Sequence, residues 1–234
     1  MIPRTHLAPQ DLDLFMSRAR NRPIFTEGDD SGAIYQVESG CIRLQKLCEN
    51  GRRCILTFCY PGDVFGLGAH GPLDVDAEAV CTSRVSKLGK SKLARMMQGE
   101  PERAMMLLDA AYGGQDQVAE HVVIISYAHA EQKLAWFLLK LNERLGQAIG
   151  DQRIVELPMM RADIADYLGM TFETVSREMT KLCDAGTISL HGLRRFTITR
   201  PAVLAALAQG NGITRTTNND VARATRQMSL AEYH

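Results

Sequence analysis

The feature that most constrains this chain is a pair of amphipathic helices, separated by a glycine, about three quarters of the way along the sequence. The segment RADIADYL (161–168) places Ile164 and Leu168 on one helix face, which predicts a helix with one buried side. Gly169 ends that helix, and Thr171 is a suitable N-cap for the next one because its hydroxyl can accept a backbone N–H bond. We therefore expect two helices joined by a short turn that contains glycine.

A second helix and a β-hairpin are expected after this turn. The helix spans residues 172–184 and stops before Gly186. The next segment, TISLHGLRRFTITR, alternates apolar and polar residues around a turn at His191-Gly192. Helix, glycine turn, helix and hairpin are the elements of a winged helix-turn-helix, which places its second helix in the major groove of DNA.

The outward face of the second helix carries the candidate base contacts. Glu173, Ser176 and Arg177 stand at positions i, i+3 and i+4 and share one helix face. An arginine can bond guanine O6 and N7 with both arms of its guanidinium group, and a glutamate can accept a hydrogen bond from cytosine N4. Three more side chains are expected to contact phosphates: Thr171, Thr174 and Lys181.

An alternative interpretation of this face needs no DNA. Glu173 and Arg177 can form an i,i+4 ion pair on the surface, worth roughly 0.3–0.5 kcal/mol. The preceding helix, the glycine turn and the hairpin favour DNA contact instead. Val175, Met179 and Leu182 lie on the opposite face and are expected to dock against the first helix.

The N-terminal part, residues 1–101, is expected to be an antiparallel β-barrel of the jelly-roll type with an N-terminal helix, which makes the whole chain α+β. Residues 24–93 alternate apolar and polar positions between turn dipeptides such as Asn50-Gly51 and Pro61-Gly62. Strands at intervals of about 10 residues are typical of a sandwich or barrel.

Residues 102–129 are expected to form one long helix that pairs with a second copy of the chain. Apolar or small residues recur at alternating steps of four and three, the heptad spacing of a seam between two helices. The seam begins at Ala104 and continues through Leu108, Ala111, Gln115, Val118, Val122 and Ile125. Gly113-Gly114 weakens this helix by about 1 kcal/mol per glycine relative to alanine.

The alternative for this helix is that it lies on its own barrel. Four residues off the seam are candidates for packing on the barrel at the same time as the seam pairs: Met106, Leu107, Val123 and Ile124. Residues 130–209 are expected to hold the winged helix-turn-helix, including a helix over 131–147 that ends near Gly146 and a short strand in IVELP. Residues 210–234 are polar and are expected to be mobile.

Composition neither supports nor excludes nucleic acid. Residues 131–200 carry 10 basic and 9 acidic side chains, so the DNA hypothesis rests on the local pattern alone. No apolar run of about 18 residues predicts a membrane span, and the start lacks an apolar signal core, so we expect a cytoplasmic protein with reduced cysteines. A cupin-like metalloenzyme needs several histidines inside its barrel, and residues 24–93 contain only His70. We expect no enzyme.

The segment DIADYLGMTFETVSREMTKLCDAGTISLHG closely resembles the DNA-binding part of the CRP/FNR superfamily of bacterial transcription regulators, and GDDSGAIYQVESGCIRLQK and PGDVFGLG look like its sensor barrel. The likeness covers roughly residues 15–200 and is strongest to the FixK branch. It implies a homodimer on a palindrome with TTGA-type half-sites, with base contacts from Glu173, Ser176 and Arg177. It also implies activation of low-oxygen and nitrogen-fixation genes by recruitment of RNA polymerase.

The resemblance also identifies the places where cofactors would bind. Cyclic-nucleotide binders hold ribose with a glutamate and phosphate with an Arg-Ser pair, but the matching positions here are Leu67, Val75 and Asp76. We expect no cyclic nucleotide, because an apolar side chain and a carboxylate cannot hold a phosphate. Haem at His70 is not expected either. The alternative is a regulator whose barrel binds an unidentified effector, haem or metal.

Oxygen-sensing members of the superfamily carry an iron–sulfur cluster on N-terminal cysteines. The first 40 residues here contain no cysteine. Four later cysteines, Cys41, Cys48, Cys54 and Cys59, lack a C-x-x-C spacing, so we expect no metal site.

Cys183, near the end of the second helix, is a candidate redox switch. Lys181 and Arg177 are expected to lower the pKa of its thiol, although the helix C-terminus opposes an anion. Oxidation would add bulk and negative charge near phosphates and weaken DNA binding. The alternative is that Cys183 only packs.

Overall fold

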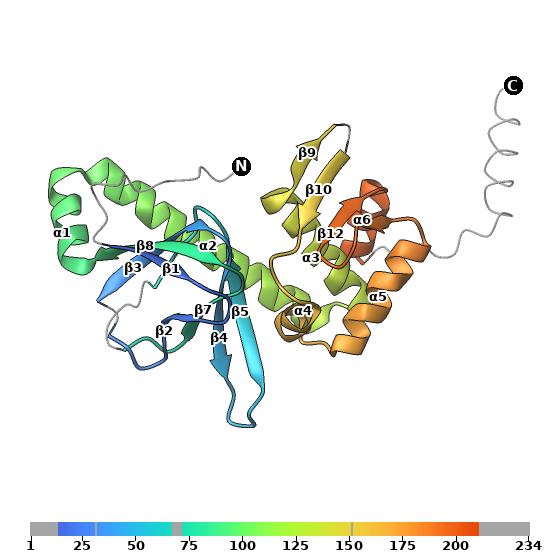
Figure 1. Cartoon of the computed structure of the whole chain (residues 1–234), viewed down its shortest axis with the longest axis horizontal. Helices are drawn as coiled ribbons and strands as arrows, with labels where there is room; N and C mark the ends of the chain where they lie inside the picture. The colour runs from blue at the N-terminus through green and yellow to red at the C-terminus, as the bar shows by residue number, and fades with distance from the viewer. Residues whose placement is uncertain (1–13, 31, 67–71, 151, 211–234) are drawn as a thin grey trace, which may run out of the picture.

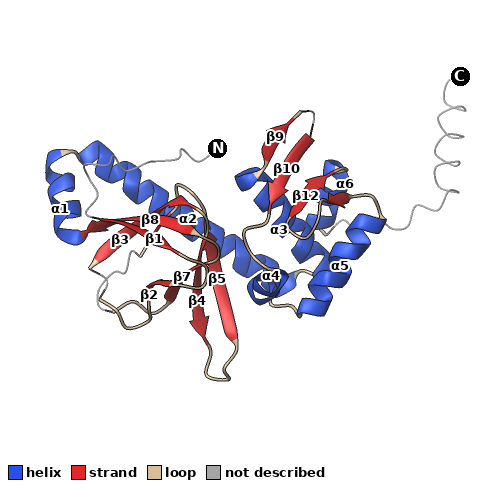
Figure 2. Ribbon diagram, viewed as in Figure 1, coloured by secondary structure: helices blue, strands red, loops and turns tan. Residues whose placement is uncertain are grey.

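The computed structural model describes residues 14–30, 32–66, 72–150 and 152–210. A β domain and a smaller C-terminal domain lie side by side, and the long helix α2 (Pro101–Tyr127) runs along the β domain toward the C-terminal one (Figure 1). Figure 2 shows that strands dominate the first domain, whereas helices surround a small sheet in the second. The expected α+β fold is confirmed.

The β domain consists of two four-stranded antiparallel sheets with the strand orders β1-β8-β3-β6 and β2-β7-β4-β5. Its strands are β1 (Leu14–Arg18), β2 (Pro23–Phe25), β3 (Ala33–Ser39), β4 (Ile42–Leu47), β5 (Arg53–Cys59), β6 (Val64–Phe65), β7 (Asp76–Ala79) and β8 (Ser83–Gly89). Phe25, Tyr35 and Ile42 belong to one buried cluster that draws on both sheets. Within the described residues the expected barrel is thus a pair of facing sheets rather than one closed cylinder.

The N-terminal helix was predicted without bounds and stays a prediction. Leu14–Arg18 form β1 and pair with β8, whose edge offers backbone hydrogen bonds to an added strand. Residues 1–13 lie outside the described part. The strands end earlier than predicted, at Gly89, and α1 (Lys90–Gly99) follows directly.

Helix α2 is continuous through Gly113 and Gly114. Ala104 is buried with Ile34 and Leu88 of the β domain, so it packs within its own protomer and not on the predicted seam. Met106 and Val123 were candidates for packing on the β domain, but both are about half exposed. That prediction is wrong for these two because a helix presents only one stripe to a flat sheet.

The C-terminal domain contains the third four-stranded sheet, with the strand order β11-β12-β10-β9, and four helices among the described residues. Its elements are α3 (Ala130–Leu145), β9 (Gln147–Ile149), β10 (Gln152–Glu156), α4 (Arg161–Leu168), α5 (Phe172–Asp184), β11 (Ile188–Leu190), β12 (Arg195–Ile198) and α6 (Pro201–Ala208). The predicted helix over 131–147, expected to end near Gly146, is confirmed: α3 ends at Leu145 with Gly146 as its C-cap, and Gln147 already pairs with Ile154. Helix α6 was not predicted.

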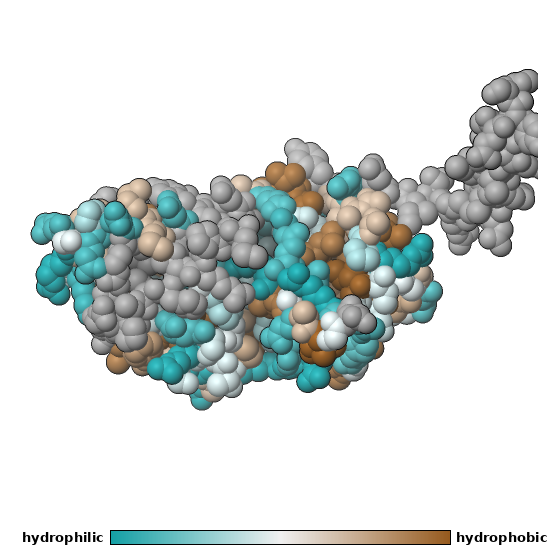
Figure 3. Space-filling view, turned by 90° about the horizontal axis from the view of Figure 1, so that it is seen from above, coloured by the Kyte–Doolittle hydropathy of each residue, from teal (hydrophilic) through white to brown (hydrophobic). Residues whose placement is uncertain are grey.

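The surface is of mixed character. Figure 3 shows hydrophobic residues gathered mainly over the C-terminal domain on the face seen from above, interspersed with hydrophilic ones. None of the helices in the described ranges is both long and apolar enough to cross a membrane. The tail from residue 211 onward lies outside the described residues.

Candidate nucleic-acid interface

The turn between α4 and α5 has the geometry that the sequence predicts. Gly169 ends α4 with φ 62° and ψ 39°, a left-handed conformation that glycine adopts without a Cβ clash. The Thr171 hydroxyl caps α5 by accepting a hydrogen bond from the backbone N–H of Thr174 at 3.2 Å. These two residues fix the angle at which α5 leaves the domain.

The inner face of α5 anchors it to α4. Val175, Met179 and Leu182 are almost fully buried, in one cluster with Ile164 and Leu168. Removal of this apolar surface from water holds α5 in place at roughly 25 cal/mol per Å² buried. The predicted docking face is confirmed, and the opposite face of α5 is left toward solvent.

Glu173 and Arg177 both lie on that exposed face. The Arg177 side chain is 64% exposed, and its Nε donates to Glu178 Oε1 at 3.4 Å. Among the described contacts Arg177 therefore pairs with Glu178 rather than with Glu173, contrary to the i,i+4 alternative. The pKa of Glu173 is lowered by hydrogen bonds from its own backbone N–H and from the Thr171 hydroxyl, so its carboxylate remains an acceptor.

Ser176 differs from its two neighbours on this face. Its Oγ is covered and has no hydrogen-bond partner in the structure, while its carbonyl accepts from the Thr180 hydroxyl at 3.0 Å. A base contact by Ser176 would require its hydroxyl to rotate outward. The spacing of the sequence places this residue on the exposed face, but it does not determine the direction of a short side chain.

The predicted phosphate contacts are at the surface and already have intramolecular partners. Thr171 and Thr174 lie with their hydroxyl oxygens 3.0 Å apart. Lys181 Nζ lies 2.9 Å from Glu178 Oε1, and the Glu178 side chain is buried. A phosphate would therefore compete with Glu178 for Lys181.

The β11–β12 hairpin adds cationic groups that the sequence analysis did not assign. Leu193, at its tip, is 86% exposed. Arg195 is exposed, and Arg194 lies within 3.5 Å of Met160 Sδ. The signal that would have identified both is the basic pair in HGLRRF, at the turn of a predicted wing. Just after the hairpin, Arg200 donates to the Ala185 carbonyl.

A buried ion-pair network joins the β domain to α4, which Figure 1 shows beside β5. Along β4, Ile42 faces the β-domain core, so Arg43 faces the opposite side. Arg43 is 5% exposed and lies 2.5 Å from Glu78 and 3.0 Å from Asp163 on α4. Arg43 therefore forms ion pairs with carboxylates of both domains.

Arg53 extends this network. It lies 2.8 Å from Asp163 and 2.5 Å from Asp166, one turn further along α4. Asp163 Oδ2 also accepts a hydrogen bond from the backbone N–H of Met160, at the start of α4. The network consequently holds α4, and α5 through it, in one orientation on the β domain.

Cys183 does not have the environment that was predicted. Its pKa is raised, first by burial and then by Asp184, while Arg161 opposes the shift. Lys181 and Arg177 were expected to lower this pKa, but both are turned to Glu178. That part of the prediction is wrong, because the side chains that a helix places nearby in sequence point away from the thiol.

The predicted cofactor positions fall partly outside the described residues. Leu67 and His70 lie there. Val75 packs against the β-domain core, and Asp76 Oδ1 accepts a hydrogen bond from the backbone N–H of Glu27 at 2.8 Å. In the part of the chain that the structure describes, no three His, Cys, Asp or Glu side chains are grouped so as to hold a metal ion.

The predicted seam of α2 is partly visible. Leu108, Val118 and Ile125 are half-buried, and Val122 is about half exposed. The side chains of Ala111 and Gln115 lie outside the described residues. Met105, which was not on the predicted seam, is also about half exposed.

Comparison with known proteins agrees with this geometry. Residues 16–100 match the cyclic nucleotide-binding domain family, and residues 132–207 match the Crp-like helix-turn-helix domain family. The nitrogen fixation regulation protein FixK of Rhizobium meliloti (strain 1021) is 36% identical over 205 residues, which cover 86% of this chain and 92% of that protein.

More distant and structural relatives lead to the same family. The fumarate and nitrate reduction regulatory protein of Salmonella typhi is 30% identical, over 81% of this chain and 76% of that protein. The structure of FixK2 from Bradyrhizobium japonicum superposes with a TM-score of 0.76 at 32% identity, over 83% of this chain and 96% of that one. The relatives are regulators rather than enzymes. The chain is a DNA-binding transcription regulator of the CRP/FNR family, in its FixK-like branch.

Proposed function

We propose that this protein is a homodimeric activator that recognises a palindrome with TTGA-type half-sites through α5. The observation that supports it most is the exposure of Glu173 and Arg177 on one face of a helix whose other face is buried. Arg177 can bond guanine with both arms of its guanidinium group, and the Glu173 carboxylate can accept from cytosine N4. One G·C pair of the half-site therefore suits these two side chains, with Ser176 contributing once its hydroxyl turns outward.

Phosphate contacts would fix the position of α5 on the duplex. We assign Thr171, Thr174 and Lys181 to this role, together with Arg195 on the hairpin. Such contacts add affinity without sequence information and make binding salt-dependent. Lys181 would exchange its ion pair with Glu178 for a phosphate, and the released Glu178 would keep Arg177 as its partner.

The dimer would form along α2. Two-fold related copies would bring the two α5 helices to half-sites about one helical turn apart, about 34 Å. We assign the contact to Leu108, Ala111, Gln115, Val118, Val122 and Ile125. Exposed Val122 supports this, because an apolar side chain on a long helix gains from a partner.

We further propose that DNA binding requires neither cyclic nucleotide nor iron–sulfur cluster. The junction network of Arg43, Arg53, Asp163 and Asp166 supports this, since it holds α4 with the chain's own charges. Asp76, at a position that would meet a cyclic phosphate, carries a charge that repels it. The alternative is a regulator whose β domain binds an unidentified effector.

The class of target genes is inferred from the names of the relatives. Three of them are named nitrogen fixation regulation protein FixK, so we infer a role in nitrogen-fixation and low-oxygen genes, by recruitment of RNA polymerase in the cytoplasm. We also propose domain boundaries after residues 101, 129 and 209, with a separate tail at 210–234.

The test is DNA binding by the purified dimer, measured by fluorescence anisotropy on a TTGA palindrome without additives. Arg177→Ala should lower affinity by about 1–3 kcal/mol and relax the preference at one G·C pair. Arg22→Ala, an exposed arginine of the β domain, is the matched control. Equal affinity and unchanged sequence preference in Arg177→Ala would refute the assignment of α5.

Cys183 remains a proposed site of redox control. Peroxide would oxidise its thiol to a sulfinic acid, and the added negative charge would lie at the end of α5 and oppose phosphates. Because burial raises the pKa of this thiol, the reaction should accelerate as pH rises. Cys183→Ser should keep DNA binding after peroxide treatment, and Cys183→Asp should lose DNA binding without peroxide. Loss of DNA binding after peroxide in both wild type and Cys183→Ser would exclude redox control through Cys183.

A further inference from the structure

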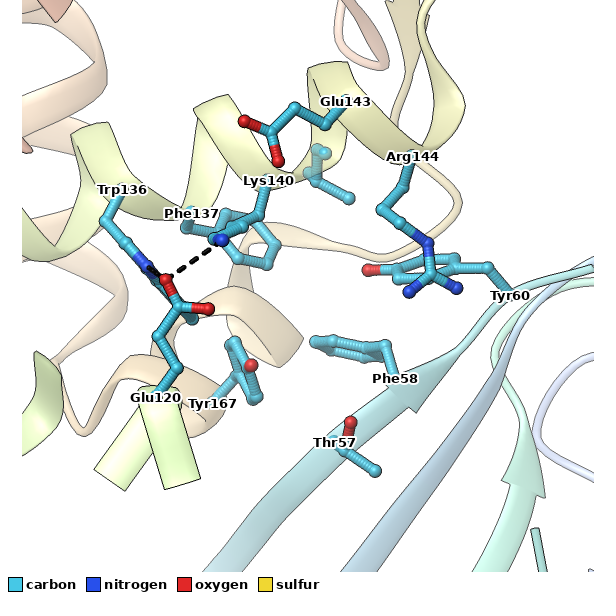
Figure 4. A pocket seen from close by; sticks show the side chains of 11 residues that line it. Thr57, Phe58, Tyr60, Glu120, Trp136, Phe137, Lys140, Glu143, Arg144 and Tyr167 are labelled. Carbon is cyan, nitrogen blue, oxygen red and sulfur yellow. Dashed lines mark hydrogen bonds and ion pairs between the residues drawn. The ribbon is translucent and has the colours of Figure 1, made fainter. Parts of the chain in front are cut away.

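A cavity of about 150 Å³ lies at the junction of the two domains, outside the core of the β domain. Strand β5 alternates across this boundary: Cys59 belongs to the inner core of the β domain, whereas Phe58 belongs to the core shared with the C-terminal domain. Figure 4 shows side chains from β5, the C-terminal part of α2, α3 and α4 around the opening. The cavity is thus distinct from the interior of the β domain.

The walls of the cavity are aromatic. Five rings line it: Phe58, Tyr60, Trp136, Phe137 and Tyr167. Phe58 and Phe137 both approach Tyr167, with ring centroids 5.1 Å and 5.6 Å away and interplanar angles of 55° and 54°. Tilted rings at such distances form the arrangement that aromatic groups prefer.

Tyr167 is held rigidly in this wall. Its ring stacks on His121 with a centroid distance of 3.8 Å and an interplanar angle of 8°. His121 Nε2 also lies 2.7 Å from the Tyr167 carbonyl oxygen. One side of the cavity is therefore formed before any ligand arrives, which lowers the entropic cost of binding.

The rim is charged but balanced. Glu120 accepts a hydrogen bond from Trp136 Nε1 at 3.0 Å and lies 2.9 Å from Lys140 Nζ. The Arg144 guanidinium lies 5.4 Å from the Tyr60 ring centroid and pairs with Asp63. Both rim cations thus already have a carboxylate partner, so an anionic ligand would have to displace one.

We propose that this cavity binds a small uncharged aromatic molecule with one hydrogen-bond donor, of the size and kind of a phenol. An apolar cavity of about 150 Å³ is large enough for a benzene ring. The ring would pack on Phe58, Phe137 and Tyr167, and its hydroxyl would donate to a rim carboxylate, Glu120 or Glu143.

Such a ligand would influence DNA binding, because it touches elements of both domains. Phe58 belongs to the β domain and Tyr167 to α4, which carries α5. A ligand that fits one arrangement of these elements better than another shifts their equilibrium by its difference in affinity. It would tune a protein that already binds DNA. This coupling rests on the proposed function, whereas binding to the cavity does not.

Trp136 provides a direct assay, because it is the only tryptophan in the chain. Phenol titrated into the purified full-length protein should change Trp136 emission, excited at a wavelength that phenol does not absorb, with saturation at about 1 mM or below. Cyclohexanol, which lacks the ring, and benzoate, which is charged, should each bind at least tenfold more weakly. No saturable change, or equal affinity for all three, would overturn the proposal.

Two substitutions test the location. Thr57→Phe places a ring into the cavity and should weaken phenol binding at least tenfold, whereas the matched control Thr82→Phe, at an exposed position on the β domain, should leave it unchanged. Lys140→Met removes a rim cation and should change phenol affinity less than threefold. If circular dichroism shows that Thr57→Phe is misfolded, Lys140→Met and the benzoate titration still test whether the cavity takes a neutral ligand. Binding that depends on Lys140 would indicate an anion site and overturn the proposal.

A separate measurement tests the coupling between the cavity and DNA binding. DNA affinity measured with saturating phenol should differ at least twofold from that without it in wild type, and the difference should vanish in Thr57→Phe. Unchanged DNA affinity in the presence of bound phenol would overturn the coupling. Failure of the protein to bind any TTGA palindrome would instead count against the proposed function, and the fluorescence titration would still test the cavity.

Discussion

Arg43→Met is the most informative perturbation of this protein, because it removes the charge at the centre of the domain junction while it keeps most of the side-chain volume. Arg43 donates to Gln45, Glu78 and Asp163 at 2.8, 2.5 and 3.0 Å. In the variant, Glu78 and Asp163 stay behind as half-buried and buried carboxylates. Breaking a buried pair by removing one partner typically costs about 3–5 kcal/mol.

The rest of the network narrows this estimate. Asp163 keeps Arg53 at 2.8 Å, and Glu78 keeps the Gln45 amide at 3.3 Å. We therefore expect a loss of about 3 kcal/mol in the free energy of unfolding, the lower end of that range. Arg53→Met is the matched control: its side chain is 29% exposed and Asp163 would keep Arg43, so it should cost about 1 kcal/mol.

Urea unfolding followed by Trp136 fluorescence and by circular dichroism measures these losses, with coincident transitions as the check on two-state behaviour. Arg43→Met should also weaken DNA binding about fivefold or more, since α4 would no longer be held in one orientation. Losses of equal size for Arg43→Met and Arg53→Met would refute the argument from burial. Unchanged DNA affinity in Arg43→Met would refute the orienting role of the network.

Two other predictions concern the turn and the domain junction. Gly169→Ala should destabilise the protein by about 1 kcal/mol in thermal unfolding. Residue 169 has a φ of 62°, and a Cβ there would meet no atom within 4 Å, so backbone strain is the whole cost. Gly169→Asn should cost less, because asparagine tolerates this conformation better, and the reverse order would contradict the argument. Burial lowers the pKa of His121 in the folded protein, so the unfolded chain binds more protons and stability falls as pH drops below the unfolded value of about 6.5. His121→Phe should flatten that fall in urea titrations between about pH 5 and 7, and a fall as steep as in wild type would assign it to other groups.

Local patterns in the sequence were sufficient to predict the helices and the hairpin of the DNA-binding module. The helix period of 3.6 residues and a glycine turn specify which residues of α5 are buried and which are exposed, and Val175, Met179, Glu173 and Arg177 lie as predicted. Ser176 marks the limit of this reasoning. A period assigns a residue to a face, but the rotation of a short side chain depends on its neighbours in space.

Contacts between segments that lie far apart along the chain could not be predicted from the sequence. Arg43 and Asp163 are 120 residues apart, and nothing in either segment marks them as partners. The same holds for Ala104, which fits a heptad seam but is buried against its own β domain. A tertiary contact can override a local preference of the sequence when the contact contributes more free energy than the preference does.

The sequence by itself determined the family, the order of the elements from α4 to β12 and the exposed face of α5, because these follow from short-range periodicity and turn chemistry. The tertiary structure alone decided the partner of Arg177, the raised pKa of Cys183, the buried network that orients α4 and the aromatic cavity beside it. These depend on burial and on charges brought together from separate segments. Such energies are set by distance in space, and distance along the chain does not reveal them.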